Sequence, residues 1–263
     1  MKLSPKGMLQ AVAVILLLFG GPVAYQFAVY HFGDGSKTNW WNAKQGNTRQ
    51  APDAGTTDDG IIQVYAARTV RWRGVLGVHT WIATKKTGED YYTRMEVMGY
   101  ALRWGRHSVQ IRRGQPDRYW YGNRPELLRE IRGGDEVDGL IDRLRYASEN
   151  YQYDGRYNIW PGPNSNTFLA YLGRRVPELN LELPSNAIGK DYLPGGSVLA
   201  ATPSGRGFQF SLGGALGFML GLEEGVEINI AGLTAGVDFS PPAIKLPAVG
   251  RIGFSDFERK LLN

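Results

Sequence analysis

The chain has 263 residues, 43% of them hydrophobic and 21% charged, so it is long enough to bury a core of its own. It holds no cysteine, which excludes disulfides, thiolate metal sites, a cysteine nucleophile and an acylated lipoprotein cysteine. The formal net charge is +5, and arginines cluster at 68–73 and 103–113. No nucleic-acid-binding motif accompanies them, so we expect no nucleic-acid partner. The clusters are either a patch that faces anionic lipid or a solvated arginine face.

The N-terminal segment combines a positive flank with a long uncharged run. Lysines precede an apolar stretch from Gly7 to Tyr30, which is long enough to cross a bilayer as a helix. A cleaved signal peptide shares this pattern. The best cleavage site, after Ala24, would place Pro22 where a small residue is required, which favours an uncleaved anchor over residues 1–32. Positive residues before the span place the following chain outside. We therefore predict a protein of the bacterial inner membrane with its C-terminal domain in the periplasm.

The rest of the chain divides by composition. Residues 33–60 are polar and glycine-rich without an apolar period, which is typical of a linker. Residues 61–194 show strand patterns followed by helical patterns, an order that predicts an α+β domain. Residues 195–263 are glycine-rich, and there we expect an antiparallel β extension packed on that domain. Glycines spaced by four from Gly213 onward leave open a membrane-associated helix over residues 206–222.

Strands come first within the α+β domain. Alternating, β-branched segments predict strands at 61–72, 74–86, 90–102 and 108–113, and a short fifth at 117–123. A stretch that begins at Pro125 and ends before two glycines predicts the first helix. Residues 135–151 carry a helical apolar stripe with Asp135 as the N-cap. A third helix begins near Ser165 and ends at Pro177.

Candidate chemistry is confined to a few residues. The metalloprotease helix motif, the Walker phosphate loop, the serine elbow of α/β-hydrolases and the Ser-x-x-Lys dyad are absent. No cluster has metal-ligand spacing, so we expect no metal and no cofactor. What remains is His79 on one predicted strand, Glu96 on the next, and Ser165 at a helix start. A nucleophile needs a base within hydrogen-bond reach, and the base needs an orienting group. The helix start offers N–H groups to an oxyanion, and the side chains of Asn164 and Asn166 could add donors.

Two tryptophans accompany these residues. Trp81 follows His79 on its strand, and Trp160 precedes Ser165 in a Pro-Gly-Pro loop. Each could line a substrate cleft or simply pack in a core. A purely structural role is also open for the polar residues, because Asn and Ser are favoured helix N-caps, a half-buried strand histidine is common, and Glu96 could simply pair with an arginine across the sheet. Ser165, His79 and Glu96 are the candidate catalytic residues, and they would act without a metal.

These residues resemble a known group of proteins. The segments HTWIA on an early strand and NSNTF at a helix start are similar to the circularly permuted papain-like fold of lecithin:retinol acyltransferase-like and PPPDE proteins. The helix-start motif of that group is Asn-Cys-x-x-Phe, with the cysteine as nucleophile and the strand histidine as base. The resemblance covers residues 61–176. It implies Ser165 in the cysteine position, His79 as the base, Glu96 as the third polar residue and Phe168 as a core-facing aromatic residue.

A wider resemblance covers residues 61–253. The motifs VHTWIA, WPGPNSNTF, AIGKDY and PAIKLPAVGRIG are similar to those of an uncharacterised Gram-negative family of membrane-anchored domains of unknown function. This resemblance implies membrane anchoring, but it implies no particular substrate or reaction.

Two functions follow as expectations. In the first, a membrane-anchored periplasmic hydrolase or acyltransferase acts on an amide or ester of an envelope component, such as a peptidoglycan peptide or a lipid. Ser165 would attack, His79 would take its proton, and Glu96 would orient His79. A serine hydroxyl is far less acidic than a thiol, so serine in place of cysteine leaves turnover open. In the second function, the same cleft binds an envelope component or a partner protein without turnover.

Overall fold

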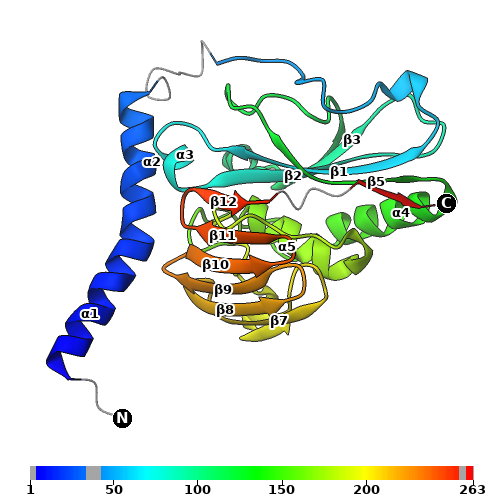
Figure 1. Ribbon diagram of the computed structural model, residues 1–263. Helices are drawn as coiled ribbons and strands as arrows, with labels where there is room; N and C mark the ends of the chain where they lie inside the picture. Colours follow the sequence, from blue (N-terminus) through cyan, green and yellow to red (C-terminus); the bar gives the residue numbers. More distant parts are fainter. Residues whose placement is uncertain (1–3, 34–42, 255–258, 263) are drawn as a thin grey trace.

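The computed structural model describes residues 4–33, 43–254 and 259–262 of the chain. Its N-terminal part is one continuous helix from Pro5 to Phe32. Within it, α1 (Pro5–Ile15) and α2 (Gly21–Phe32) are joined by the π-helical turn η1 (Leu16–Gly20). By length and composition this helix could cross a membrane, and only 6% of its apolar window is buried in the molecule. Figure 1 shows it running beside the folded part of the chain.

The first sheet has six strands in the order β13-β5-β1-β2-β3-β4. They are β1 (Gly60–Arg68), β2 (Val78–Lys85), β3 (Thr93–Val97), β4 (Val109–Arg113), β5 (Glu126–Gly133) and β13 (Arg259–Leu262). Neighbouring strands pair antiparallel, except that β13 runs parallel to β5. Helices α4 (Asp135–Glu149) and α5 (Ser165–Arg175) cover one face of this sheet (Figure 1). The mixture of helices and antiparallel strands confirms the predicted α+β class.

Both faces of the first sheet are buried. Side chains alternate along a strand, so each strand contributes to two cores. On the helix side, Ile62 and Ile82 pack in one cluster with Leu144 of α4 and Phe168 of α5. The opposite cluster includes Tyr65, Trp81 and Trp120. Segments 43–56 and 114–124 cover this opposite side, where Asp117 accepts hydrogen bonds from Thr48 and Gln50.

Short helical turns connect these elements. They are α3 (Arg73–Leu76), η3 (Ala54–Thr56), η4 (Gly99–Trp104), η5 (Pro177–Leu179) and η6 (Pro194–Gly196). Part of the segment expected to be a linker, from residue 43 to residue 59, packs on the first sheet through Ala51 and Ala54. The preceding residues 34–42 lie outside the described part of the chain.

The second sheet has seven strands in the order β12-β11-β10-β9-β8-β7-β6, with every neighbour antiparallel and next in sequence. They are β6 (Leu199–Ala201), β7 (Gly207–Leu212), β8 (Leu216–Gly221), β9 (Gly225–Ile230), β10 (Leu233–Phe239), β11 (Pro242–Leu246) and β12 (Gly250–Gly253). Residues 207–221 are therefore two strands and their turn, rather than a helix. In Figure 1 this sheet lies below the first, with β12 next to it.

Buried charges join the second sheet to the chain segment that follows α5. Lys190 forms an ion pair with Glu227 of β9, and both side chains are almost fully buried. Lys245 of β11 pairs with Glu182 and, at 3.2 Å, with Glu227. Charges this deep are tolerated only in pairs. This network therefore fixes the second sheet onto the α+β part.

Several predicted elements differ from the structure, and the predicted strands at 74–86 and 90–102 also include residues of the helical turns α3 and η4. The stretch from Pro125 is strand β5, not a helix, because it pairs with central strand β1 and places Ile131 opposite Ile62. Tertiary pairing here overrides helix propensity. The fifth strand predicted at 117–123 is a turn with two isolated bridges, from Arg118 to Asn47 and from Trp120 to Asn123. The N-cap of α4 is Gly134, so Asp135 is already the first helical residue.

Candidate functional site

Ser165 is the first residue of α5, and the N-terminus of this helix is capped by a side chain. The N-cap residue is Asn164, whose Oδ1 accepts the N–H groups of Asn166 at 2.9 Å and Thr167 at 3.2 Å. Thr167 Oγ1 in turn accepts the N–H of Asn164 at 3.1 Å, which completes a capping box. The N–H groups of Asn166 and Thr167 are two of the backbone donors that an oxyanion at this helix start could use. In this structure they are bonded to the protein itself.

The two asparagines proposed to contact substrate hold the helix in place. Asn166 Nδ2 donates to Val78 O at 3.0 Å and to Ile188 O at 2.8 Å. Asn164 Nδ2 donates to Ile159 O at 3.1 Å and to the same Ile188 O at 3.0 Å. Both side chains are buried. Because an amide group has few bonds to offer, these contacts leave little capacity for a ligand.

A glycine allows this close contact. Gly189 has φ +100°, and a Cβ at this position would lie 2.3 Å from Asn164 Nδ2. Thr167 Oγ1 also donates to Gly189 O at 2.7 Å. The AIGKDY segment thus packs its backbone directly on the start of α5, and glycine is required there by both space and backbone angle.

His79 lies on the opposite face of the first sheet from Ser165. Its neighbour Thr80 donates from Oγ1 to Ser165 O at 3.3 Å and to Asn166 Oδ1 at 3.0 Å, so Thr80 points toward α5. Adjacent strand residues point to opposite faces. The His79 ring accordingly stacks on Trp120, with centroids 3.8 Å apart and planes at 8°. The structure does not bring the proposed base and nucleophile together, because the sheet lies between them.

The two tryptophans have structural contacts. Trp81 is fully buried on the same face as His79 and donates from Nε1 to Pro116 O at 2.7 Å. Trp160 is exposed and donates from Nε1 to Ala231 O at 2.8 Å, which ties the Pro-Gly-Pro loop to the second sheet. Trp81 therefore lies away from Ser165, and Trp160 links two parts of the fold.

His79 and Glu96 do lie side by side, as the neighbouring strands suggest. His79 Nε2 is 3.2 Å from Glu96 Oε2, and both side chains are buried. Three arginines approach the other carboxylate oxygen. Their Nη2 atoms lie 2.8 Å (Arg94), 3.3 Å (Arg112) and 3.7 Å (Arg118) from Glu96 Oε1. We call Arg94, Arg112 and Arg118, gathered around Glu96, the arginine cluster.

The protonation states in this cluster follow from burial and charge. Burial raises the pKa of Glu96, but the hydrogen bond with His79 and the charge of Arg94 outweigh it and lower that pKa to about 2. Burial lowers the pKa of His79, more than its contact with Glu96 raises it. Glu96 is thus an ionised acceptor, so neutral His79 carries its proton on Nε2 and donates it. Burial also lowers the pKa of Arg94, to about 10, which leaves the guanidinium charged at neutral pH.

The arginine cluster has more positive than negative charge. Three guanidinium groups face one carboxylate, and the imidazole is neutral. Arg94 is buried, whereas the side chains of Arg112 and Arg118 are 43% and 33% exposed and reach solvent. Arg94 Nε and Arg118 Nε are buried, and neither donates a hydrogen bond within the described residues. Guanidinium groups that outnumber the carboxylates at a partly open site are suited to a second anion.

The sequence contained part of this signal. Arg112 belongs to the arginine-rich stretch at 103–113 and lies on the strand next to that of Glu96, whereas Arg94 and Arg118 lie outside both arginine-rich stretches of the sequence. Arg94 precedes Glu96 by two residues on a strand, which places both on one face. The sequence alone therefore predicts that the side chains of Arg94 and Glu96 lie next to each other. Arg118 lies in a loop, and only the folded chain brings it to Glu96.

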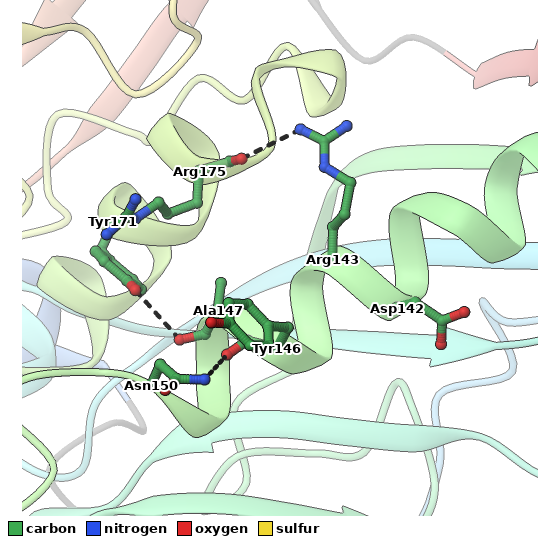
Figure 2. A pocket seen from close by; sticks show the side chains of 7 residues that line it. All are labelled: Asp142, Arg143, Tyr146, Ala147, Asn150, Tyr171 and Arg175. Atoms are coloured by element: carbon green, nitrogen blue, oxygen red, sulfur yellow. Dashed lines mark hydrogen bonds between the residues drawn. The ribbon is translucent and has the colours of Figure 1, made fainter.

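A surface hollow of about 540 Å³ lies between α4 and α5, away from the residues discussed so far (Figure 2). It is lined by Asp142, Arg143, Tyr146, Ala147, Asn150, Tyr171 and Arg175. Several of its polar groups bond across or within the helices. Arg143 donates to Arg175 O at 3.2 Å, and Tyr171 donates to Ala147 O at 3.3 Å. The hollow is the seam between two packed helices, and it includes none of the predicted site residues.

Among the residues that the structure describes, no group of three or more His, Cys, Asp or Glu side chains could hold a metal ion. The family model described as protein of unknown function (DUF3750) matches residues 59–192, about half of the chain, and the chain belongs to that family. The match covers the first sheet up to β5, α4, α5 and the AIGKDY segment, and it ends before the second sheet. No curated protein and no solved structure matches the chain.

Proposed function

We propose that this member of the DUF3750 family is a membrane-anchored protein of the bacterial envelope that binds an anionic envelope component at the arginine cluster, without turnover. The N-terminal helix would hold it in the inner membrane, with the first sheet and its arginine cluster on the periplasmic side. The observation that carries the proposal is the convergence of three guanidinium groups on one buried carboxylate. The surplus positive charge opens to solvent through Arg112 and Arg118.

Each residue of the cluster has a distinct part in this proposal. Glu96 Oε1 holds the guanidinium groups in place, and His79 Nε2 fixes the other carboxylate oxygen, Oε2, by a hydrogen bond. Arg94 is buried and adds positive charge next to Glu96 without reaching solvent. Arg112 and Arg118 offer the accessible donors, which match the geometry of carboxylate or phosphate oxygens. A peptidoglycan stem peptide and a phospholipid headgroup both supply such an anion.

A papain-like hydrolase, the other expectation, needs two arrangements around Ser165. The base must reach its hydroxyl, and backbone donors must be free for the oxyanion. His79 lies across the sheet, and the donors of Asn166 and Thr167 are bonded to Asn164. These contacts favour binding without turnover over hydrolysis or acyl transfer.

The test measures the dissociation constant of the full chain in phosphatidylcholine nanodiscs. One arm titrates a soluble peptidoglycan stem peptide, and a second replaces part of the phosphatidylcholine with phosphatidylglycerol to test the lipid source. The variant is Arg112→Gln/Arg118→Gln. Arg145→Gln is the matched control, because Arg145 is an exposed helical arginine paired with Glu149.

A hydrogen bond to a charged group contributes about 1.5–3 kcal/mol, so we expect the double variant to bind the anion at least about tenfold more weakly. The control should bind as the natural chain does. Equal binding by the double variant and the natural chain would contradict the proposal, as would the absence of binding in both arms.

A further inference from the structure

The outward side of the second sheet is apolar across its whole width. Paired residues on adjacent strands form one continuous row, with Ile252, Ile244, Val237, Val226, Leu220 and Phe208 in register. A second row contains Ile228, Phe218, Phe210 and Leu199. Ile244, Leu220 and Phe208 are each about half exposed. We call these two rows the outer face.

The inward side of the same strands is polar. Gln209, Glu227, Asn229, Asp238 and Lys245 alternate with the outer-face residues and are almost completely buried. The charged residues of strands β6 to β12, all of which the structure describes, lie on this inward side. An antiparallel sheet with one face in water normally has the reverse pattern. Exposed apolar patches of this extent mark an interaction surface.

The N-terminal helix meets the second sheet at the helix midpoint. Turn η1 lies against β10, and Phe19 in η1 is buried although the helix around it is exposed. Figure 1 shows the strands of the second sheet stacked along the direction of the helix, from β12 at the level of α2 to β7 at the level of α1. Strands lie about 4.8 Å apart, so the sheet spans roughly 30 Å, close to the thickness of a bilayer's hydrocarbon core.

We propose that the outer face contacts the acyl chains of the membrane that the N-terminal helix crosses. This inference is independent of the anion site on the first sheet. A helix that spans the bilayer would bring β10 and its neighbours to the depth of the hydrocarbon. The outer face offers that environment apolar side chains only.

The inward side meets the demands of the same environment. Charges near a bilayer must be paired, and Lys190, Lys245 and Arg251 each have an acidic partner. Backbone groups at the sheet edge also need partners. At β6, Arg174 Nε donates to Ala201 O at 2.8 Å. A second copy of the chain would cover the apolar rows equally well, but it would not explain why they lie alongside the anchor helix.

The natural absence of cysteine permits a direct test, because each introduced thiol is the only one in the chain. Phe218→Cys and Ile244→Cys place an environment-sensitive fluorophore on the outer face of the full chain in phosphatidylcholine vesicles. Leu17→Cys, on the exposed side of the helix, is the membrane control. Tyr146→Cys, exposed on α4, is the aqueous control.

Two quenchers separate the occupants. We expect lipid carrying a mid-chain doxyl group to quench the labels at 218, 244 and 17 at least about twofold more than the label at 146. Iodide stays in water, so it should quench the label at 146 more than the other three. Iodide quenching of both outer-face labels would overturn the inference. Protection of these labels from both quenchers, with energy transfer between copies, would assign the face to a second copy and overturn it as well.

Discussion

The two sheets of this chain bury opposite kinds of side chain. The first sheet buries apolar residues on both faces, and its Ile62 and Tyr65 are both inaccessible to solvent. The second sheet buries Glu227 and Lys245 and exposes Ile244 and Phe208. Strand alternation produces two chemically distinct faces in each case, but it does not decide which face is covered. The surroundings of each sheet decide that, and the exposed apolar face of the second sheet fits the proposed contact with a membrane.

The largest expected effect on stability comes from removing one partner of the buried ion pairs in the second sheet. Glu227→Leu removes the partner of Lys190 and one partner of Lys245, and loss of one member of a buried pair costs about 3–5 kcal/mol. We expect the free energy of unfolding in detergent micelles to fall by that amount. Lys190→Met/Glu227→Leu should recover part of it. A loss below about 1 kcal/mol in the single variant would show that the pair contributes little to the fold.

The first sheet has one ionised carboxylate whose effect on stability depends on pH. The pKa of Glu96 is about 2 in the folded chain and 4.5 for the ordinary group. The folded state therefore holds the ionised form more favourably, and this stabilisation is present above pH 4.5 and is lost as the pH falls toward 2. The loss is on the order of 3 kcal/mol.

Urea unfolding of the natural chain and of Glu96→Gln, at a series of pH values between 6 and 2, checks this effect. The variant should be less stable at pH 6 and should lack the corresponding decline. Parallel curves for the two chains would contradict the proposed state of Glu96.

The start of α5 provides an effect of intermediate size. Asn164→Ala removes the N-cap and the two bonds to the loop carbonyls, which should destabilise the chain by about 2 kcal/mol. Asn150→Ala, at the exposed end of α4, is the control and should change the free energy of unfolding by less than about 0.5 kcal/mol. An equal effect of the two substitutions would mean that the capping box does not hold α5.

The smallest expected effect concerns the nucleophile position. Ser165→Cys introduces the residue found in the papain-like group, and alkylation of this single thiol can be followed against pH. His79 lies across the sheet, and Asn164 caps the helix donors, so we expect no thiolate near neutral pH and a pKa no lower than that of ordinary cysteine. Alkylation that titrates below pH 7 in Ser165→Cys, but not in Ser165→Cys/His79→Gln, would restore the catalytic pair.

The sequence predicted the helices and strands whose formation depends on residues close together in the chain. The apolar stripe of α4, the start of α5 near Ser165, and the strands that carry His79 and Glu96 all follow from periodicity and capping preferences. Residues 125–134 were misassigned because their propensity is helical, whereas the pairing of β5 with β1 depends on distant residues.

The candidate site was predicted only in part, for the same reason. Order along the chain suggested that His79 faces Ser165, but the register of β2 turns Thr80 toward α5 instead. The arginine cluster depends on a loop contact of Arg118, which no local pattern encodes. Strand register and loop packing therefore determine which side chains meet at this site, and neither is encoded in a local sequence pattern.

Binding at the arginine cluster, rather than at Ser165, is tested most directly by one comparison of dissociation constants. The full chain in nanodiscs, Arg112→Gln and Ser165→Ala are titrated with the same anionic envelope ligand. We expect about tenfold weaker binding for Arg112→Gln and unchanged binding for Ser165→Ala, since Arg112 reaches solvent beside Glu96 and Ser165 is buried behind the sheet. Weaker binding of Ser165→Ala with unchanged binding of Arg112→Gln would contradict this assignment.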